Sequence, residues 1–552
     1  MKKFFCLCLL FLALTACGQQ RREDIGGALP ILSPTYYGNY GASFFAPTYI
    51  RVVIGTSNFE GLIHESPQIT ATGAFFVERD GNTTRFGAGE VFCPVGKFPT
   101  SEYIAAPINS SSNLGAAIPP SRGVVGVCTA NFNRGVSSAS DTRRELPEVG
   151  AEGTTTDPNA ASTLFRISTE SPYTRLKILN LARNWQNNAT PQYRGVFEIS
   201  QRENGFVIVN ELPLEEYLYA VVPSEMPSAH GVEASKVQAV TARTFAYHQM
   251  REERFRDFGA HVDDSVISQV YNNIPENEIA IEAVRATRGQ ILTFNGEIIL
   301  ANYFSTSGGT TANFGEVWAV GETFPSYTPE FLRARAQMLT YHPGNLRTEE
   351  AASAFFRNTE VPAFDRQFPW FRWQVTMTAQ ELSHRINTAL HTRQTANPTM
   401  IHMLNAYGAP TAAPAHSIGT LQHMEVTRRG QGGNIMEMLF RGTEGVVRVQ
   451  TEFNIRTLLN PAEIPVTRHD GTTSGTLTLL PSAFFTFDTE YDANGNLQSV
   501  TIFGGGNGHG VGKSQNGVRA LLDMGLTYVE ILRHYYPGTE ITFTSTMSDI
   551  IP

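Results

Sequence analysis

The chain has 552 residues, which is enough for two or three domains and a sizeable core. Charged residues make up 17% and hydrophobic residues 41%, a balance typical of globular rather than disordered proteins. The formal net charge is −9, which argues against duplex nucleic acid as a partner, because phosphate binding needs a basic face.

Residues 1–16 have the pattern of a secretion signal: two lysines, an apolar run over residues 4–13 and a site of small residues. The stretch Leu14-Thr15-Ala16-Cys17 is similar to a bacterial lipobox, which predicts cleavage before Cys17 and acylation of its thiol. An ordinary signal peptide with an incidental cysteine is the alternative. The apolar run is shorter than the roughly 20 residues of a membrane-spanning helix. We therefore expect a protein of the cell envelope, on the periplasmic or outer surface side, that a lipid at Cys17 anchors to a membrane.

The next segment, residues 17–47, is rich in Gly, Pro, Ser and Tyr and predicts a flexible tether. Cys93 and Cys128 remain as an even pair once the leader and Cys17 are set aside. A disulfide suits an exported chain, and two buried free thiols are the open alternative.

Residues 48–200 predict a β-rich N-terminal region with insertions. Strands are expected at residues 50–54 and 73–77, and Asp80-Gly81-Asn82 after the second strand predicts a hairpin. A polar loop is expected at residues 134–162, and a further hairpin at residues 194–199 and 205–210.

The stretch ELPLEEYLYAVVPSEMPSAHGVEASKVQAVTARTFAYHQM, residues 211–250, predicts a short helix, a break and a long helix. The break is expected at residues 223–227, because each of its two prolines disfavours helical geometry in the residue before it. The long helix is expected from Gly231 to about Glu252. Glu225 lies in the break beside apolar residues, and such surroundings raise the pKa of a carboxyl, which suits a general acid.

Lys236 and Arg243 are seven residues apart on the long helix and share a face. A cationic stripe beside Glu225 would bind an anionic or heavily hydroxylated ligand. An amphipathic helix capped by an exposed acid is the alternative that spacing alone favours.

A short helix is expected at residues 281–289, followed by a hairpin of residues 291–294 and 297–304 over Asn295-Gly296. Its second strand leads into a turn whose hydroxyls and glycines could contact sugar, or which is simply a tight turn. The candidate binding residues of this turn are Ser305, Ser307, Gly308 and Gly309. The turn is not a Gly-x-Ser-x-Gly nucleophile elbow, which argues against an esterase.

Residues 369–501 predict a β-rich region with one helix, which starts after Thr378 and covers residues 379–389. A polar insertion is expected at residues 391–415. Strands are expected at residues 372–376, 423–428, 435–440, 446–450 and 499–503.

The glycine-rich loop GGGNGHGVGKSQ, residues 504–515, follows a predicted strand. It is not a phosphate loop, because Asn507 stands where that motif needs glycine, and an exported chain meets no nucleotide. We expect the loop to place His509, Ser514 and Gln515 beside the active-site cleft.

Three stretches in this order resemble the stage II sporulation protein D (SpoIID) family and its relatives, the amidase enhancers. They are residues 211–250, YFSTSGGTTANFGEVW at residues 303–318, and the segment of residues 504–539 that begins with the glycine loop. The resemblance implies an α+β fold, β-rich with a central catalytic helical segment and two lobes flanking a cleft. Its expected parts are a SpoIID-like core at residues 201–330, a β-rich second lobe with an insertion at residues 331–500, and residues 501–552, which complete the core.

The resemblance also implies a function, because characterised members are lytic transglycosylases that cut peptidoglycan glycan strands. Glu225 matches the catalytic acid/base of the family. Lys236, Gln238 and Arg243 match positions that would bind glycan or steady the site, and Gln269 would contact substrate or support the fold. No cofactor is implied.

This sequence departs from the family pattern at two places. Some members carry Cys and His zinc ligands just before the position of Gln269, where this chain has Val, Ile and Ser, so we expect no metal. Asn507 replaces a usual aromatic residue and Lys513 a usual apolar one. The departures at Asn507 and Lys513 weaken a catalytic interpretation, but the presence of Glu225, Lys236 and Arg243 favours it. We therefore expect an enzyme that leaves 1,6-anhydro-muramoyl ends. The alternative is a non-catalytic amidase enhancer that binds glycan or a partner cell-wall amidase.

Overall fold

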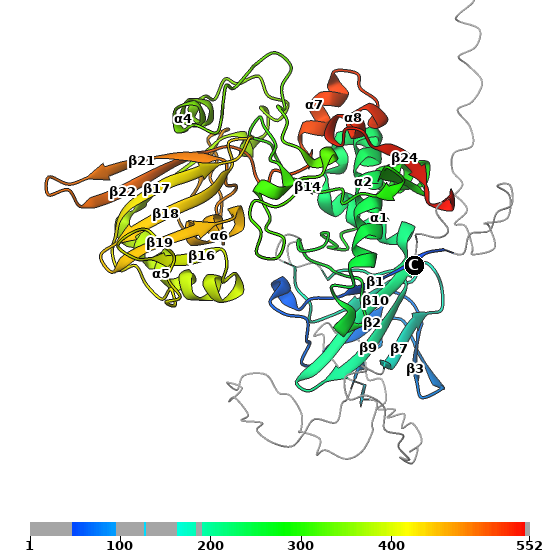
Figure 1. Cartoon of the computed structure of the whole chain (residues 1–552). Helices are drawn as coiled ribbons and strands as arrows, with labels where there is room; N and C mark the ends of the chain where they lie inside the picture. Colours follow the sequence, from blue (N-terminus) through cyan, green and yellow to red (C-terminus); the bar gives the residue numbers. More distant parts are fainter. Residues whose placement is uncertain (1–46, 95–125, 128–162, 184–189, 547–552) are drawn as a thin grey trace, which may run out of the picture. The chain divides into compact units, whose positions relative to one another are not determined.

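The computed structural model describes residues 47–94, 126–127, 163–183 and 190–546 (Figure 1). The expected leader, Cys17, Cys128 and the polar loop at residues 134–162 lie outside these residues. Within the described part the fold mixes helices with several sheets, which confirms the predicted α+β class. No helix among the described residues is long and apolar enough to cross a membrane.

A seven-stranded sheet forms the first part of the described chain, in the order β11-β1-β10-β9-β7-β3-β4. Its strands are β1 (Tyr49–Val53), β3 (Phe75–Arg79), β4 (Asn82–Phe86), β7 (Thr163–Thr169), β9 (Val196–Arg202), β10 (Gly205–Pro213) and β11 (Val262–Asp263). Both predicted hairpins are confirmed, as β3–β4 and β9–β10. Asp80 and Gly81 have φ angles of 50° and 76°, the left-handed backbone of a tight hairpin turn.

A small sheet in the order β6-β5-β2-β8 accompanies it. Its strands are β2 (Ile69–Ala71), β5 (Phe92–Cys93), β6 (Gly126–Val127) and β8 (Leu176–Ile178). Cys93 is disulfide-bonded, as one of the two open alternatives expected.

Three helices follow: α1 (Leu214–Glu225), α2 (Gly231–Glu252) and α3 (Glu278–Ala286). The bounds of α2 match the prediction and a break does separate it from α1, but the break begins later than the expected residue 223, because α1 runs through Pro223 and ends at Glu225. Proline leaves one helical carbonyl without its N–H partner. The helix persists because Pro223 lies in its last turn and because Val221 and Val222 are buried in the core. The chain leaves the helix only at Met226, the extended residue before Pro227.

The C-terminal segment returns to this helical region. Helices α7 (Gly517–Asp523) and α8 (Tyr528–Tyr535) both contact α2 (Figure 1). Strand β24 (Glu540–Phe543) pairs with β12 (Gln290–Phe294), which also forms the expected Asn295-Gly296 hairpin with β13 (Glu297–Ile298).

The hairpin differs from the prediction in its second strand, which ends at Ile298 instead of continuing to residue 304. Residues beyond it form β14 (Tyr303–Phe304), which pairs in parallel with β23 (Lys513–Ser514). This pairing joins the turn at residues 305–310 to the glycine loop, two stretches that are about 200 residues apart in the sequence.

The remaining chain contains two four-stranded sheets with their own apolar core. One has the order β20-β15-β22-β21 and the other β16-β19-β18-β17. The strands are β15 (Trp373–Thr378), β16 (Ile401–Leu404), β17 (Leu421–Arg429), β18 (Ile435–Gly442), β19 (Gly445–Gln450), β20 (Thr467–Arg468), β21 (Phe485–Tyr491) and β22 (Leu497–Gly504), and the helices of this part are α4 (Glu349–Arg357), α5 (Ala379–Ala396) and α6 (Glu452–Leu458).

Two predictions for this part need correction. Helix α5 begins where expected, with Thr378 and Glu381 in a capping box, but it extends to Ala396, and α6 is a second helix. The polar insertion expected at residues 391–415 contributes the end of α5 and strand β16. Ile401 pairs with Val449, and Met400, Ile401 and Ala415 are buried, so apolar residues hold in the core a segment that is otherwise polar.

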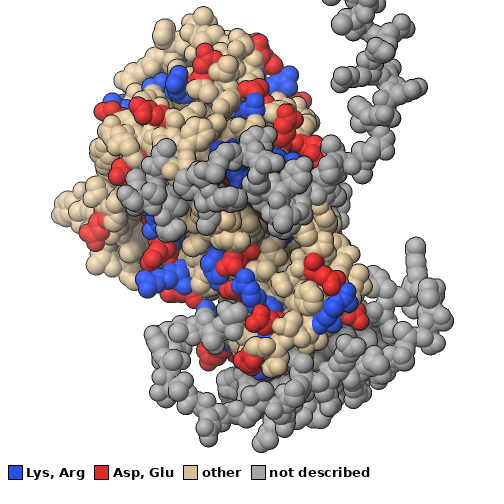
Figure 2. All heavy atoms as spheres, turned by 90° about the vertical axis from the view of Figure 1, so that its right-hand side faces the viewer, with Lys and Arg blue, Asp and Glu red and all other residues tan. Residues whose placement is uncertain are grey.

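Charges of both signs are intermixed on the surface. Figure 2 shows Lys and Arg beside Asp and Glu over the described part of one face, without a broad area of one sign.

Candidate functional site

Glu225, the last residue of α1, is half-buried and accepts hydrogen bonds from three distant segments. Its Oε1 accepts from the Val270 amide at 2.8 Å and from the Tyr303 hydroxyl at 2.9 Å. Its Oε2 accepts from the Gln515 side-chain amide at 3.0 Å. Burial raises the pKa of the Glu225 carboxyl, and these three donors and the Lys513 charge offset part of that rise. The carboxyl is therefore fixed in place, is partly open to solvent, and keeps its proton to a higher pH than a free glutamate does.

Gln269 holds the Tyr303 hydroxyl in position next to Glu225. Its side-chain amide donates to the Tyr303 hydroxyl at 3.1 Å and to the Ala242 carbonyl at 3.3 Å, while its Oε1 accepts from the Tyr217 hydroxyl at 3.4 Å. Gln269 is 1% exposed, so it orients Tyr303 and does not itself line the surface. Burial raises the pKa of Tyr303 well above its ordinary value, which keeps its hydroxyl a hydrogen-bond donor.

Lys513 lies against the ring of the same tyrosine and is 0% exposed. Its Nζ donates to Gln238 Oε1 at 2.6 Å and lies 5.1 Å from the centroid of the Tyr303 ring. Burial lowers the pKa of Lys513 to about 7, although the charge of Glu225 acts in the opposite direction. Gln238 is thus a partner of Lys513 inside the protein.

The turn after β14 is tied to the glycine loop by a buried carboxyl, Asp365. Its Oδ1 accepts from the Ser307 amide at 2.9 Å and from the Ser514 hydroxyl. Burial raises the pKa of Asp365 to about 7. Gly308 is needed for the close approach, because a Cβ there would lie 2.8 Å from the carbonyl carbon of Gly505.

The hydroxyls of this turn have partners within the protein. The Ser307 hydroxyl donates to the Thr310 carbonyl at 3.1 Å and accepts from the Gly309 amide at 2.9 Å. Ser305 is half-buried and its hydroxyl lies 3.1 Å from that of Thr306. Of the four turn residues predicted to contact sugar, Ser305 has the accessible side chain, whereas Ser307, Gly308 and Gly309 are buried.

His509 is half-buried in an aromatic group. Its ring centroid lies 4.9 Å from that of Trp318 and 5.8 Å from that of Phe304. Its Nδ1 accepts from the Val511 amide at 3.1 Å, and burial lowers the pKa of His509 to about 4. The imidazole is therefore neutral near pH 7.

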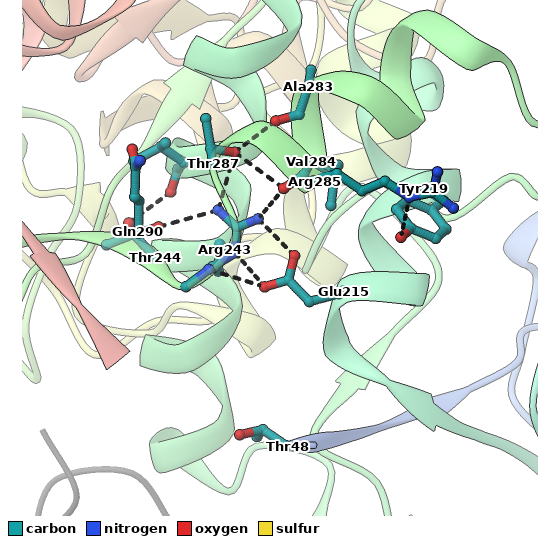
Figure 3. A network of polar contacts seen from close by, with 12 residues as sticks. Thr48, Glu215, Tyr219, Arg243, Thr244, Ala283, Val284, Arg285, Thr287 and Gln290 are labelled. Carbon is teal, nitrogen blue, oxygen red and sulfur yellow. Dashed lines mark hydrogen bonds and ion pairs between the residues drawn. The ribbon is translucent and has the colours of Figure 1, made fainter. Parts of the chain in front are cut away.

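The cationic stripe expected from Lys236 and Arg243 does not form. Arg243 is 0% exposed and makes a two-point ion pair with Glu215 of α1, at 2.9 and 2.8 Å (Figure 3). It also donates to the carbonyls of Val284 and Gln290, so it fastens α1 and α2 to α3 and β12. Lys236 pairs instead with Glu233 and lies 5.6 Å from the centroid of the Tyr528 ring.

Sequence reasoning missed three residues of this site. Tyr303 and the Val270 amide contact Glu225, and Asp365 holds the glycine loop to the turn. Tyr303 is the first residue of the stretch 303–318 that resembles the SpoIID family, so its position in that stretch could have indicated a role in the site. No local pattern marks Asp365. Among the described residues, no group of three or more His, Cys, Asp or Glu side chains could hold a metal ion.

Comparisons with known proteins relate this chain to stage II sporulation protein D and to the amidase enhancer. The model of the stage II sporulation protein (SpoIID) matches residues 202–294, which contain α1, α2 and α3, and a domain of unknown function (DUF8618) matches residues 392–512. Stage II sporulation protein D of Bacillus subtilis is 27% identical over 349 residues, 60% of this chain and 76% of that protein.

Two further relatives match shorter shares of their own length. The amidase enhancer of Bacillus subtilis is 26% identical over 334 residues, which are 59% of this chain but only 40% of that protein. An uncharacterised protein of Brachyspira hyodysenteriae is 34% identical over 131 residues, 23% of this chain and 35% of that protein. The chain is thus a homologue of the stage II sporulation protein D and amidase enhancer proteins, with a SpoIID domain at residues 202–294.

Proposed function

We propose that this chain is an exported lytic transglycosylase that cuts peptidoglycan glycan strands with Glu225 as its single acid/base. The observation that carries the proposal is the setting of Glu225, a half-buried carboxyl whose pKa is raised and whose position is fixed by three donors. An acid that must hold a proton near neutral pH needs such a raised pKa. The family relationship supplies the substrate class.

In the proposed reaction, protonated Glu225 gives its proton to the glycosidic oxygen as the bond to the anomeric carbon breaks. The carboxylate that remains then takes the proton of the muramoyl 6-hydroxyl, whose oxygen bonds to the anomeric carbon and closes the 1,6-anhydro ring. The nucleophile belongs to the substrate, so one carboxylate suffices and no water is consumed, unlike in a two-carboxylate hydrolase. The donors from Val270, Tyr303 and Gln515 favour the carboxylate formed midway.

The remaining candidate residues divide into two groups in this proposal. Ser305 and His509 are half-buried and would contact glycan in the expected cleft between two lobes. Gln238, Gln269, Arg243, Ser307 and Ser514 are buried and would act by holding the site in shape. Attachment through Cys17 would place the enzyme at the membrane, within reach of the cell wall.

The test is Glu225→Gln, which keeps the shape of the side chain and removes its titrating proton. Loss of a positioned general acid costs about 10²–10⁴-fold in rate, so release of anhydro-muramoyl products from purified peptidoglycan should fall by that factor. Glycan binding in a sedimentation assay should be retained. Glu233→Gln, which alters a more exposed glutamate of α2, is the matched control. A Glu225→Gln variant as active as the Glu233→Gln control would refute the proposed role.

The similarity to the amidase enhancer favours a second candidate, in which the chain binds glycan and stimulates a cell-wall amidase without cutting glycan itself. The same preparation separates the two candidates. An enhancer would release no anhydro sugars alone, would raise the rate of an added amidase, and would keep this effect in the Glu225→Gln variant.

A further inference from the structure

The most unusual charged group outside the proposed chemistry is the ammonium of Lys513. It is 0% exposed, and its contacts are the Gln238 oxygen at 2.6 Å and the face of the Tyr303 ring at 5.1 Å, with no carboxylate within ion-pair distance among the described residues. A buried cation without a paired anion is costly, and an apolar residue would fill the space at lower cost. The presence of a lysine at this buried position therefore points to a role that depends on its surroundings.

Those surroundings lead directly to Glu225. Tyr303 presents its ring face to the Lys513 ammonium and donates its hydroxyl to Glu225 Oε1 at 2.9 Å. Tyr303 and Lys513 are register partners in the parallel pair β14–β23, so the backbone fixes their relative position. Gln515, two residues beyond Lys513, donates to the other oxygen of Glu225. The segment that carries the ammonium is thus also a support of the carboxyl.

The tyrosines and the histidine that surround this pair stay neutral near pH 7, whereas Asp365, which accepts from the hydroxyl of Ser514 next to Lys513, has a pKa that burial raises to about 7. Burial raises the pKa values of Tyr217 on α1, Tyr303 on β14 and Tyr536 after α8, and it lowers the pKa of His509 in the glycine loop to about 4. Gln238 on α2 does not titrate. On the α2 side, Lys236 is occupied by Glu233 and Tyr528. The charge of Lys513 lowers the pKa of Glu225, and the charge of Glu225 raises the pKa of Lys513, so each group influences the protonation of the other.

We propose that Lys513 is a positioning residue that sets the pH range in which Glu225 holds its proton, an inference that rests on the proposed acid/base role of Glu225. A charged ammonium favours the carboxylate and so releases the proton at lower pH. Since burial lowers the pKa of Lys513 to about 7, this influence fades as pH rises through neutrality. The site would therefore lose its acid form more gradually with rising pH than an isolated carboxyl does.

The experiment compares Lys513→Met, which removes the charge, with Lys513→Arg, which keeps a charge at every accessible pH. The rate of anhydro-muramoyl release is measured from pH 4 to pH 9 on whole peptidoglycan. The Met variant should move the alkaline limb of the profile upward by on the order of one pH unit, about tenfold in rate on that limb, and the Arg variant should move it downward. An effect of the charge should shift the alkaline limb in opposite directions in the two variants, whereas a packing defect should not.

A second measurement does not depend on catalysis. The titration of the Glu225 carboxyl is followed by ¹³C NMR in glutamate-labelled protein, with Glu225→Gln identifying the resonance. The pKa should rise in Lys513→Met and also in Lys513→Gln, which can still hydrogen-bond to Gln238 but carries no charge. If the chain proves to be a non-catalytic enhancer, this shift still tests the coupling. An unchanged Glu225 titration in folded Met and Gln variants, or equal shifts of the same sign in Met and Arg variants, would overturn the inference.

Discussion

Replacing Glu215 with glutamine should destabilise the helical region more than the loss of an exposed ion pair of similar length would. The change leaves the Arg243 guanidinium, which is 0% exposed, without its anion while preserving the size of the partner side chain. Breaking a buried ion pair by removing one partner costs on the order of 3–5 kcal/mol, because the remaining charge is uncompensated. At about 2–4 °C per kcal/mol, the value for a cooperative unit of about 150–250 residues, the unfolding temperature of the helical region should fall by roughly 6–20 °C.

The assay is differential scanning calorimetry, with attention to the transition that contains α1, α2 and α3. Glu233→Gln is the matched control, since the Lys236–Glu233 pair lies on the same helix with side chains 22% and 45% exposed and should cost less than about 1 kcal/mol. The double variant Glu215→Gln with Arg243→Met should recover part of the loss, because it removes the orphaned charge. A Glu215→Gln variant no less stable than the Glu233→Gln control would contradict this account of Arg243.

Three other outcomes are expected. Asp365 has a folded-state pKa of about 7 against an ordinary value of 3.8, so its stabilising protonation is complete below about pH 4 and is lost as pH rises to about 7. Asp365→Asn should therefore make the unfolding temperature fall less between pH 5 and pH 8 than it does in the unaltered chain. Treatment with a chelator should leave glycan cleavage unchanged, and zinc found at one per chain by elemental analysis would contradict this. Cys17→Ser should move the protein from the membrane fraction to the soluble envelope fraction, and equal membrane retention would count against a lipid anchor.

Hairpins and helices whose formation depends mainly on neighbouring residues were predicted correctly from the sequence. The Asp-Gly and Asn-Gly hairpins and the full length of α2 follow from turn chemistry and periodicity, and the structure has them. The prediction that the break begins at Pro223 was wrong because the effect of proline on helices concerns the backbone alone. The prediction does not take into account the burial of Val221 and Val222, which keeps the last turn of α1 in place.

The site was predictable only in part, because the residues that contact Glu225 lie far from it in the sequence. Glu225 stood out through its immediate neighbours, but its donors come from Val270, Tyr303 and Gln515, the last of them 290 residues away. Arg243 shows the converse, since its spacing from Lys236 suggested a shared face whereas its partner Glu215 lies on another helix. Periodicity gives the face of a helix on which a residue lies but does not identify what packs against that face.

The parallel pairing of Tyr303–Phe304 with Lys513–Ser514 has a consequence for the timing of assembly. A nascent chain that has reached only residue 500 already contains Glu225, yet it lacks Gln515 and the strand that aligns with Tyr303. Long-range strand pairing is slow compared with local helix formation, so α1 and α2 can be complete before the carboxyl acquires all of its donors. Under the proposed acid/base role of Glu225, the site would therefore be complete only after the C-terminal segment had folded back onto β14.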